Sequence, residues 1–332
     1  MKRLGNIFDK IISVENLVLA EQKARKGKGF QRGIKFFDKN ADKLIAQLHY
    51  DLENNLIQPP KYHTKTIFEP KERLIFVMEY YPHRIIQHAI LNILEPMFLK
   101  HFISQTYASI KGKGINGVRI TMQKYLKDVK NTKYCLSFDI KKCYPSINHD
   151  VLKTLVRKKV KDKRVLNLID MYIDSTDGLP IGNYLSQFLA NYYFSFFDHY
   201  VKEVLREKYY IRYMDDGRIL SASKKRLHYV LNECNAYLER ELKVKMKGNY
   251  QIFPIDKRGI DFVGFRFYHG YTLIRKRIKK NLCKKVAKIN HYKRTITDKE
   301  RKMMIASWIG WCKYSNSKNL QKTLNIYELL CK

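Results

Sequence analysis

Acidic residues are scarce in this 332-residue chain: 31 Asp and Glu stand against 65 Lys and Arg, and the formal net charge is +34. An excess of this size repels itself in a compact fold unless a polyanion is bound. Nucleic acid is therefore the expected partner, ahead of an anionic membrane surface or an acidic protein. A content of 45% hydrophobic and 13% aromatic residues excludes a disordered chain.

Long apolar runs and paired cysteines are also missing. No stretch is long and apolar enough to span a membrane, and the charged sequence after Met1 lacks the pattern of a signal peptide, so we expect a cytoplasmic protein with no membrane contact. The ten histidines are dispersed and the six cysteines have no C-x-x-C spacing, which excludes a zinc site and a disulfide framework. The cysteines, expected to be reduced, are Cys135, Cys143, Cys234, Cys283, Cys312 and Cys331.

Two adjacent carboxylates, Asp215 and Asp216, lie between the aromatic and apolar residues 209–213 and the apolar pair 219–220. Gly217 follows them directly. Asp-Gly between two such runs predicts a β-hairpin, because glycine tolerates the positive φ of a tight turn. Taken alone, the stretch also fits an ordinary charged turn.

A third carboxylate, Asp139, ends a stretch in which apolar and polar residues alternate from 134 to 140, the pattern of a strand. A long apolar helix, predicted from residue 185 to 205, then leads the chain to the hairpin. If the strand pairs beside the hairpin, Asp139 and Asp215 converge. Converging carboxylates raise one another's pKa unless cations are present, and two Mg²⁺ ions, with Mn²⁺ as a substitute, would remove that cost.

Adjacent strand residues point to opposite faces, so Asp215 is expected to bridge both ions with Asp139 while Asp216 assists. Together with the net charge of +34, the arrangement predicts nucleotidyl transfer onto a nucleic-acid 3′ end. Ser186 and Gln187 begin the long helix without a packing reason, which favours site residues. The cation-rich run 157–164 fits a solvated helix end and a nucleic-acid contact equally well.

The remaining patterns predict further helices and strands. The helices are expected at residues 8–24, 40–54, 85–98, 117–130, 150–160, 224–242 and 299–330. The strands are expected within residues 61–78 and at 250–255 and 260–267.

Phe138-Asp139-x-x-x-x-Tyr144 and Tyr213-Met-Asp-Asp216, in this order, resemble the catalytic motifs of reverse transcriptases. The resemblance continues in Glu69-Pro-Lys-x-Arg73, Arg84-Ile-Ile-Gln-His88, Gly259-Ile-Asp-Phe-Val-Gly-Phe265 and Ser307-Trp-x-Gly-Trp311. It implies an α+β right-hand polymerase fold with fingers, a palm made of an antiparallel sheet with helices on one face, and a helical thumb. The implied segments are an N-terminal helical extension (1–58), fingers (59–133 with part of 160–180), palm (134–255), primer-grip region (256–274) and basic thumb (275–332).

The loop before the long helix narrows the resemblance to one group of reverse transcriptases. Most relatives have Gln-Gly there, whereas Pro180-Ile-Gly-Asn-Tyr-Leu-Ser-Gln187 resembles the enzymes of diversity-generating retroelements. That family implies a bacterial or prophage-encoded enzyme, a template-repeat RNA, a small basic oligomeric accessory variability protein, and cDNA with errors at template adenines. His83 and Tyr184-Leu185 depart from its usual pattern.

Two alternatives stay open. One is a retron-like or phage-defence reverse transcriptase without adenine-selective mutagenesis. The other is a catalytically silent RNA-binding protein that kept the fold.

The resemblance also implies roles for site residues. Lys71 and Arg73 would hold the dNTP triphosphate, Tyr144 would exclude a 2′-OH, and Ile181 and Gln187 would line the nascent base-pair pocket. Lys247 would protonate the leaving pyrophosphate. The metal ligands would be Asp139, the Ile140 backbone carbonyl, Asp215 and Asp216. Primer or template contacts, on the template RNA and the cDNA/RNA duplex, are expected from Ser186, Phe262, Gly264, Arg275, Lys276, Arg277, Lys279 and Lys280.

Overall fold

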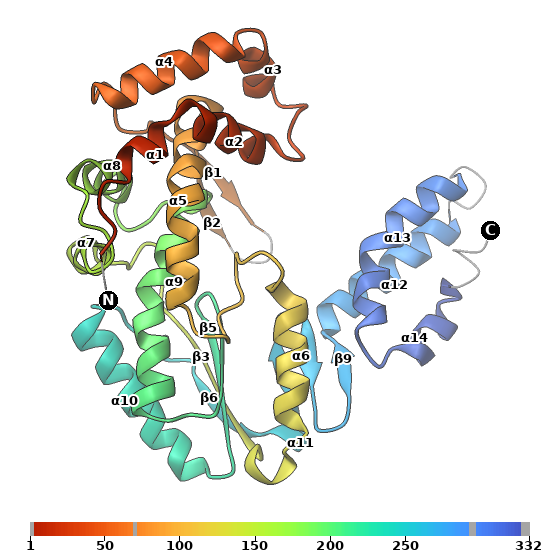
Figure 1. The fold of residues 1–332 in the computed structure, drawn as a ribbon. Coiled ribbons are helices and arrows are strands. Elements are labelled where there is room, and N and C mark those ends of the chain that lie inside the picture. The colour runs from red at the N-terminus through yellow and green to blue at the C-terminus, as the bar shows by residue number, and fades with distance from the viewer. Residues whose placement is uncertain (1–2, 69–71, 292–296, 327–332) are drawn as a thin grey trace.

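A four-stranded antiparallel sheet with strand order β4-β5-β3-β6 forms the centre of the protein (Figure 1). The computed structural model describes residues 3–68, 72–291 and 297–326. The strands are β3 (Tyr134–Asp139), β4 (Tyr209–Tyr213), β5 (Asp216–Ser221) and β6 (Gln251–Pro254). The predicted strand at 134–140 and the predicted hairpin are therefore confirmed, and they pair directly.

Alternating residues of the central sheet build two cores. One face carries Leu136, Phe138, Tyr210 and Ile219, and the other carries Cys135, Ile211, Leu220 and Phe253. The first face packs on α9 (Tyr184–His199) and α10 (Lys224–Glu241), as the expected fold requires. The second face packs on α6 (Gly114–Leu126), which lies within the segment expected to be fingers.

The N-terminal helices cap the long helix α5 (Ile85–His101) at the top of Figure 1. They are α1 (Phe8–Ile12), α2 (Val14–Arg25), α3 (Arg32–Asp38) and α4 (Ala41–Glu53). The single helix expected at 8–24 is two helices, because Ser13 leaves the helical conformation and its side chain accepts a hydrogen bond from the Asn16 N–H. The Asn16 side chain in turn donates to the carbonyls of Ile11 and Ala89, at 2.7 and 3.1 Å, which fixes the break against α5.

A hairpin of β1 (His63–Ile67) and β2 (Arg73–Val77) leaves this helical layer. Its second strand is tied to the loop before α9, since the Phe76 N–H donates to the Ile181 carbonyl at 2.8 Å. The segment η1 (Tyr80–Arg84), which is kinked at Tyr81 with φ of −105° and ψ of 137°, joins β2 to α5. Another, η3 (Tyr200–Val204), continues α9 to the predicted end of the long helix.

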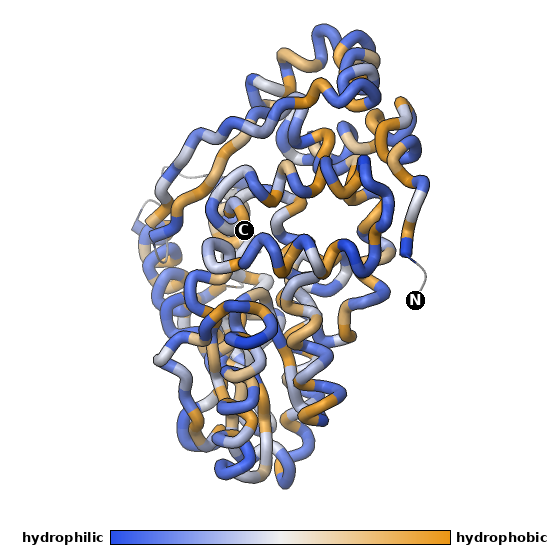
Figure 2. The backbone as a smooth tube through the Cα atoms, turned by 90° about the vertical axis from the view of Figure 1, so that its left-hand side faces the viewer, coloured by the Kyte–Doolittle hydropathy of each residue, from blue (hydrophilic) through white to orange (hydrophobic). Residues whose placement is uncertain are grey.

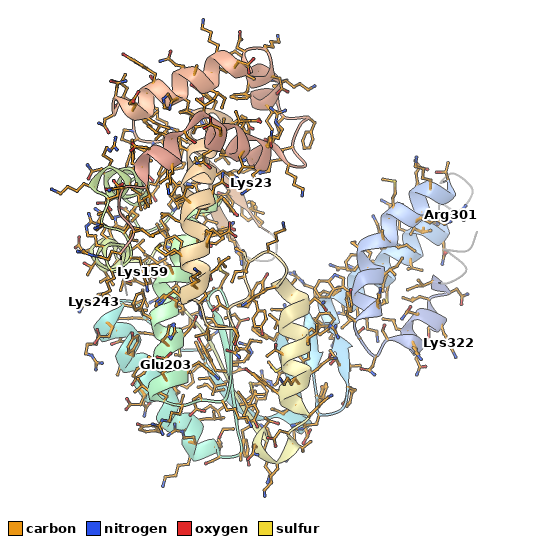
Figure 3. The ribbon with its side chains drawn as sticks, in the orientation of Figure 1. Lys23, Lys159, Glu203, Lys243, Arg301 and Lys322 are labelled. Carbon is orange, nitrogen blue, oxygen red and sulfur yellow. The ribbon has the colours of Figure 1, made fainter. Side chains whose placement is uncertain are left out.

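Part of the cation-rich run 157–164 makes structural contacts. It joins α7 (His149–Arg157) to α8 (Lys163–Ile173). Arg157 pairs with Asp170 at 2.5 Å, and Arg164 pairs with Asp9 at 2.6 Å. Lys159 is only 9% exposed and lies on the side of the body away from α12–α14 (Figure 3). Lys158, Lys161 and Lys163 of the same run are exposed, so a solvated helix end and a nucleic-acid contact both stay open.

The C-terminal part begins with a small antiparallel sheet and ends in helices. The strand expected at 260–267 is a hairpin, β7 (Ile260–Phe262) and β8 (Phe265–Phe267), because Val263 and Gly264 turn the chain with φ of 43° and 91°. Strand β9 (Thr272–Ile274) follows. The helices α12 (Lys276–His291), α13 (Asp298–Lys313) and α14 (Lys318–Thr323) stand beside the sheet, away from α1–α4 (Figure 1).

Hydrophobic and hydrophilic residues alternate along the helices (Figure 2). In the part of the chain that the structure describes, no helix is both long enough and apolar enough to cross a bilayer. The cysteines at 135, 143, 234, 283 and 312 are free thiols, as expected.

Gly217 is needed for packing and not for its backbone conformation. The prediction that it supplies the positive φ of the hairpin is wrong, because Gly217 belongs to β5 and Met214 takes φ of 54°. A Cβ at Gly217 would overlap the ring of Phe138, which faces it across the β3–β5 pair.

We expect Gly217→Ala to lower the melting temperature, because the Phe138 ring is buried and has no free space to enter. Overpacking of this kind costs about 1–3 kcal/mol. Gly248→Ala is the matched control, since no atom lies within 4 Å of a Cβ built there. Thermal unfolding of both variants checks the prediction, and an unchanged melting temperature for Gly217→Ala would contradict it.

Candidate active site

The turn that joins β4 to β5 brings two of the predicted acids together. Tyr213 and Asp216 close the hairpin, and Met214 and Asp215 form the turn itself. The Asp215 carbonyl accepts a hydrogen bond from the Ile140 N–H at 3.0 Å, and Asp139 is paired in register with Asp216. The turn is thereby fastened to the end of β3, where Asp139 lies.

The carboxyl groups of Asp215 and Asp139 interact directly. Burial, together with the hydrogen bond and the negative charge of Asp139, raises the pKa of Asp215 to about 6. This is the mutual effect expected of converging carboxylates. With the backbone of Ile140 beside them, they form a set of oxygen donors that suits a hard divalent cation.

The third acid, Asp216, is held by an arginine that the sequence pattern did not single out. Arg218 forms an ion pair with the Asp216 carboxylate and donates to the Asp261 carbonyl at 2.8 Å, and its guanidinium lies 4.5 Å from the centre of the Phe262 ring. Within residues 3–68, 72–291 and 297–326, no three His, Cys, Asp or Glu side chains form a metal-binding group. Asp139 and Asp215 thus interact with each other, whereas the Asp216 carboxylate is bound to Arg218, and its expected part in metal binding stays a prediction.

Lys247 lies beside the end of β3. Its N–H donates to the Asp139 carbonyl at 2.8 Å, and its ammonium group forms an ion pair with the Asp139 carboxylate. The two side chains are 29% and 25% exposed, so solvent and ligands reach the pair. Lys247 is thus close to the acids, where a proton donor for a departing group would stand.

Of the residues expected at the incoming nucleotide, Arg73 lies within electrostatic reach of Tyr144. Burial raises the pKa of the Tyr144 hydroxyl, the charge of Asp215 adds to the rise, and Arg73 opposes it, so Tyr144 lies within electrostatic reach of both. Ile181 is bonded to β2 through its carbonyl, and the Gln187 side chain accepts a hydrogen bond from the Ser109 hydroxyl at 2.9 Å. Lys71 lies outside the described residues.

Residues 64–267, more than half of the chain, match the family described as reverse transcriptase (RNA-dependent DNA polymerase). The chain belongs to the reverse transcriptase family. Strand β3, the β4–β5 turn, strand β2 and the long helix α9 all fall within the matched residues, as does β1 apart from His63.

Among curated relatives, Protein YkfC of Escherichia coli (strain K12) is 23% identical over 239 residues, which cover 58% of this chain and 61% of that protein. Nuclear intron maturase 4, mitochondrial, of Arabidopsis thaliana is 24% identical over 176 residues, or 49% of this chain and 21% of that protein. The chain thus spans less than two thirds of the length of these relatives.

A solved structure with a similar fold is that of telomerase from Candida albicans in complex with a TWJ fragment of telomeric RNA. Its TM-score is 0.51 at 13% identity, and the match covers 69% of this chain and 51% of that chain. The corresponding Candida tropicalis complex gives a TM-score of 0.50 at 14% identity, with 69% and 49% covered. The likeness shows the right-hand polymerase fold.

Three expected primer or template contacts of this reverse transcriptase lie inside the protein. Ser186 is 4% exposed, Phe262 is fully buried under Arg218, and Gly264 is buried. The side chains of Ser186 and Phe262 are therefore in no position to reach a nucleic acid, and Gly264 has no side chain to offer. Ser186 is a core residue despite its polar hydroxyl, and a Cβ at Gly264 would overlap the ring of Trp311, so Gly264 lets the thumb pack on the hairpin turn.

The predicted basic contacts of the thumb lie on its surface. Lys276, Arg277, Lys279 and Lys280 are exposed on α12, whose apolar side, Leu282, Val286 and Ile289, is buried. Arg275 is half-buried and pairs with Asp261 at 2.5 Å. The exposed cations leave a charged helix face that suits a phosphate backbone.

Proposed function

We propose that this chain is an RNA-directed DNA polymerase that copies an RNA template into cDNA by two-metal nucleotidyl transfer. The observation that carries the proposal is the meeting of Asp139 and Asp215 where the β4–β5 turn is bonded to the end of β3. Mg²⁺ ions held by Asp139, Asp215 and the Ile140 carbonyl would activate the primer 3′ hydroxyl and neutralise the phosphate charge.

The protein's own residues would place the nucleotide. Arg73, exposed at the start of β2, would pair with the triphosphate, and the half-buried Tyr144 ring would lie under the sugar. Ile181 would contact the nascent base pair, because its hydrogen bond to Phe76 fixes it between the hairpin and α9. Lys247 would give a proton to the departing pyrophosphate.

A groove of about 710 Å³ between α3 and β2 offers a path for the uncopied template. Arg32, Arg84 and Phe36, whose side chain is 64% exposed, line it. Arg84 also lines a second hollow that reaches Gly182 and Tyr184, next to the base-pair pocket. Cations interleaved with aromatic rings bind single-stranded nucleic acid through phosphates and stacked bases.

We further propose that the enzyme serves a diversity-generating retroelement of a bacterium or its prophage, acting in the cytoplasm. The support is the stretch from Pro180 to Gln187 and the branched side chain of Ile181 at the base-pair pocket. A template-repeat RNA and a small basic oligomeric accessory variability protein would then be the partners. We propose the segment boundaries given above for this enzyme, with α6 assigned to the palm because it packs on the central sheet.

The two rivals differ in what they predict. A retron-like or phage-defence enzyme would polymerise without adenine-selective errors. A silent RNA-binding protein would not polymerise at all, and the paired acids with Lys247 beside them argue against it.

Primer extension with sequencing of the products tests the proposal. The protein, given an annealed DNA primer on an RNA template, four dNTPs and Mg²⁺, is expected to make cDNA with most substitutions opposite template adenine. An even error spectrum would favour the retron-like rival, and no extension on several templates would contradict polymerase activity. Ile181→Asn is expected to reduce the adenine errors without abolishing synthesis, because it changes the shape of the base-pair pocket.

A further inference from the structure

A fully buried ion pair lies next to the β4–β5 turn that carries Asp215. Arg212 on β4 is 1% exposed and Asp198, in the last turn of α9, is 0% exposed. The guanidinium donates twice to the carboxylate, from Nε at 2.7 Å and from Nη2 at 2.6 Å. The hydroxyls of Tyr210 and Thr106 also donate to Asp198, at 2.6 and 3.3 Å.

The Arg212 guanidinium also contacts the turn between β4 and β5. Its Nη1 donates to the carbonyl of Met214 at 2.7 Å. Met214 has φ of 54°, a conformation that a residue with a side chain adopts only when its surroundings hold it there. The next carbonyl, that of Asp215, is held by the Ile140 N–H at 3.0 Å. The carbonyls of Met214 and Asp215 are thus both fixed by hydrogen bonds, one before and one after the Asp215 Cα atom.

The charged pair is not explained by stability alone. Apolar residues of similar volume often serve a core as well as, or better than, a buried ion pair. The fixed fork of arginine, however, can bind a carboxylate with two nitrogens and a carbonyl with the third, whereas lysine is a single point charge. The Asp198 carboxylate is saturated by its partners, so the Arg212 fork is held in one orientation.

We propose that Asp198 and Arg212 are positioning residues that orient the Asp215 carboxylate for a divalent cation. The inference rests on the proposed function insofar as Asp215 is a metal ligand. Neither residue touches the nucleotide or the cation. They hold the Met214 carbonyl, and the backbone fixed in this way sets the orientation of the Asp215 side chain.

The variant Arg212→Lys separates the two roles of the arginine. A lysine keeps the positive charge opposite Asp198 but lacks the hydrogen bond to the Met214 carbonyl. The protein contains a matched control in Arg226, which pairs with the largely buried Glu207 at 2.8 Å and donates to the Leu205 carbonyl at 2.6 Å. Arg226 holds the end of η3 and the start of α10 and makes no contact with the catalytic turn.

Mn²⁺ binding, followed by electron paramagnetic resonance of the free ion, tests the proposal without requiring activity. Arg212→Lys is expected to weaken Mn²⁺ binding about tenfold and to raise by a similar factor the Mg²⁺ concentration for half-maximal primer extension. Arg226→Lys is expected to bind Mn²⁺ as the unaltered protein does, with a smaller loss of melting temperature than Arg212→Lys because the Arg226 side chain is 41% exposed. Equal Mn²⁺ affinity of the two variants would overturn the inference, as would absence of Mn²⁺ binding by the unaltered protein.

Tyr210→Phe is the second variant if Arg212→Lys does not fold, because it removes one hydrogen bond to Asp198 and leaves Arg212 in place. It is expected to weaken Mn²⁺ binding about threefold, and an unchanged affinity would overturn the inference. A protein that binds Mn²⁺ through this network but never extends a primer would disprove the proposed function and leave the inference standing.

Discussion

Asp215→Asn is expected to abolish primer extension and at the same time to raise the thermal stability of the metal-free protein. The loss of activity should be on the order of 10³-fold or more, because a neutral amide replaces a carboxylate at the reacting phosphate. The stability gain has a different cause. Burial and the neighbouring Asp139 raise the pKa of Asp215 from 3.8 to about 6, which means that its charged form is unfavourable in the folded protein.

The sign of the stability effect follows from this pKa. The unfolded chain releases the Asp215 proton near pH 4, whereas the folded protein holds it to about pH 6. Stability of the unaltered protein should therefore fall as the pH rises through this window, by about 1–3 kcal/mol. Asp215→Asn carries no such proton and should be more stable above pH 6, with little difference from the unaltered protein below pH 4.

Melting curves between pH 4 and 8, without divalent ions, check the prediction beside primer extension. Asp42→Asn is the control, an exposed acid in the first turn of α4. It should change neither activity nor the pH dependence. Activity of Asp215→Asn within tenfold of the unaltered protein would disprove the assigned role of Asp215.

Arg218→Met is expected to cause a large loss of stability. The side chain is 6% exposed, and its guanidinium pairs with Asp216 and donates to the carbonyls of Gly217 and Asp261. Methionine would fill the space against Phe262 but would leave the Asp216 carboxylate without its cation. Breaking a fully buried pair costs about 3–5 kcal/mol. Because the Asp216 side chain is 36% exposed, we expect about 2–4 kcal/mol here.

The matched control is Arg275→Met, which breaks the nearby pair with Asp261. Both partners of that pair are exposed, at 36% and 47%, so its loss should cost at most about 1 kcal/mol. Thermal unfolding of both variants supplies the measurement. Asp216→Asn added to Arg218→Met should recover part of the lost stability, since no uncompensated charge is left. Equal destabilisation by Arg218→Met and Arg275→Met would refute this account of Arg218.

The sequence by itself determined the local elements and the chemistry that they carry. The alternation from Tyr134 to Asp139 and the apolar spacing along α9 are properties of neighbouring residues, so strand and helix followed from periodicity alone. The Asp139 and Asp215 motifs carried the resemblance to reverse transcriptases for the same reason, because their order and spacing along the chain are visible without a structure. The meeting of these two acids was predicted and is confirmed.

Only the tertiary structure decided which polar residues support the acids. The partners of Arg212 and Arg218 include Asp198 and Asp261, which lie at other places in the chain and carry no local pattern. The burial of Ser186 could not be predicted from the sequence for the same reason, since it depends on which distant residues pack over the start of α9. Hydrogen bonds and packing between distant segments thus placed the positive φ at Met214, turned Asp216 to Arg218 and set the geometry around Asp215.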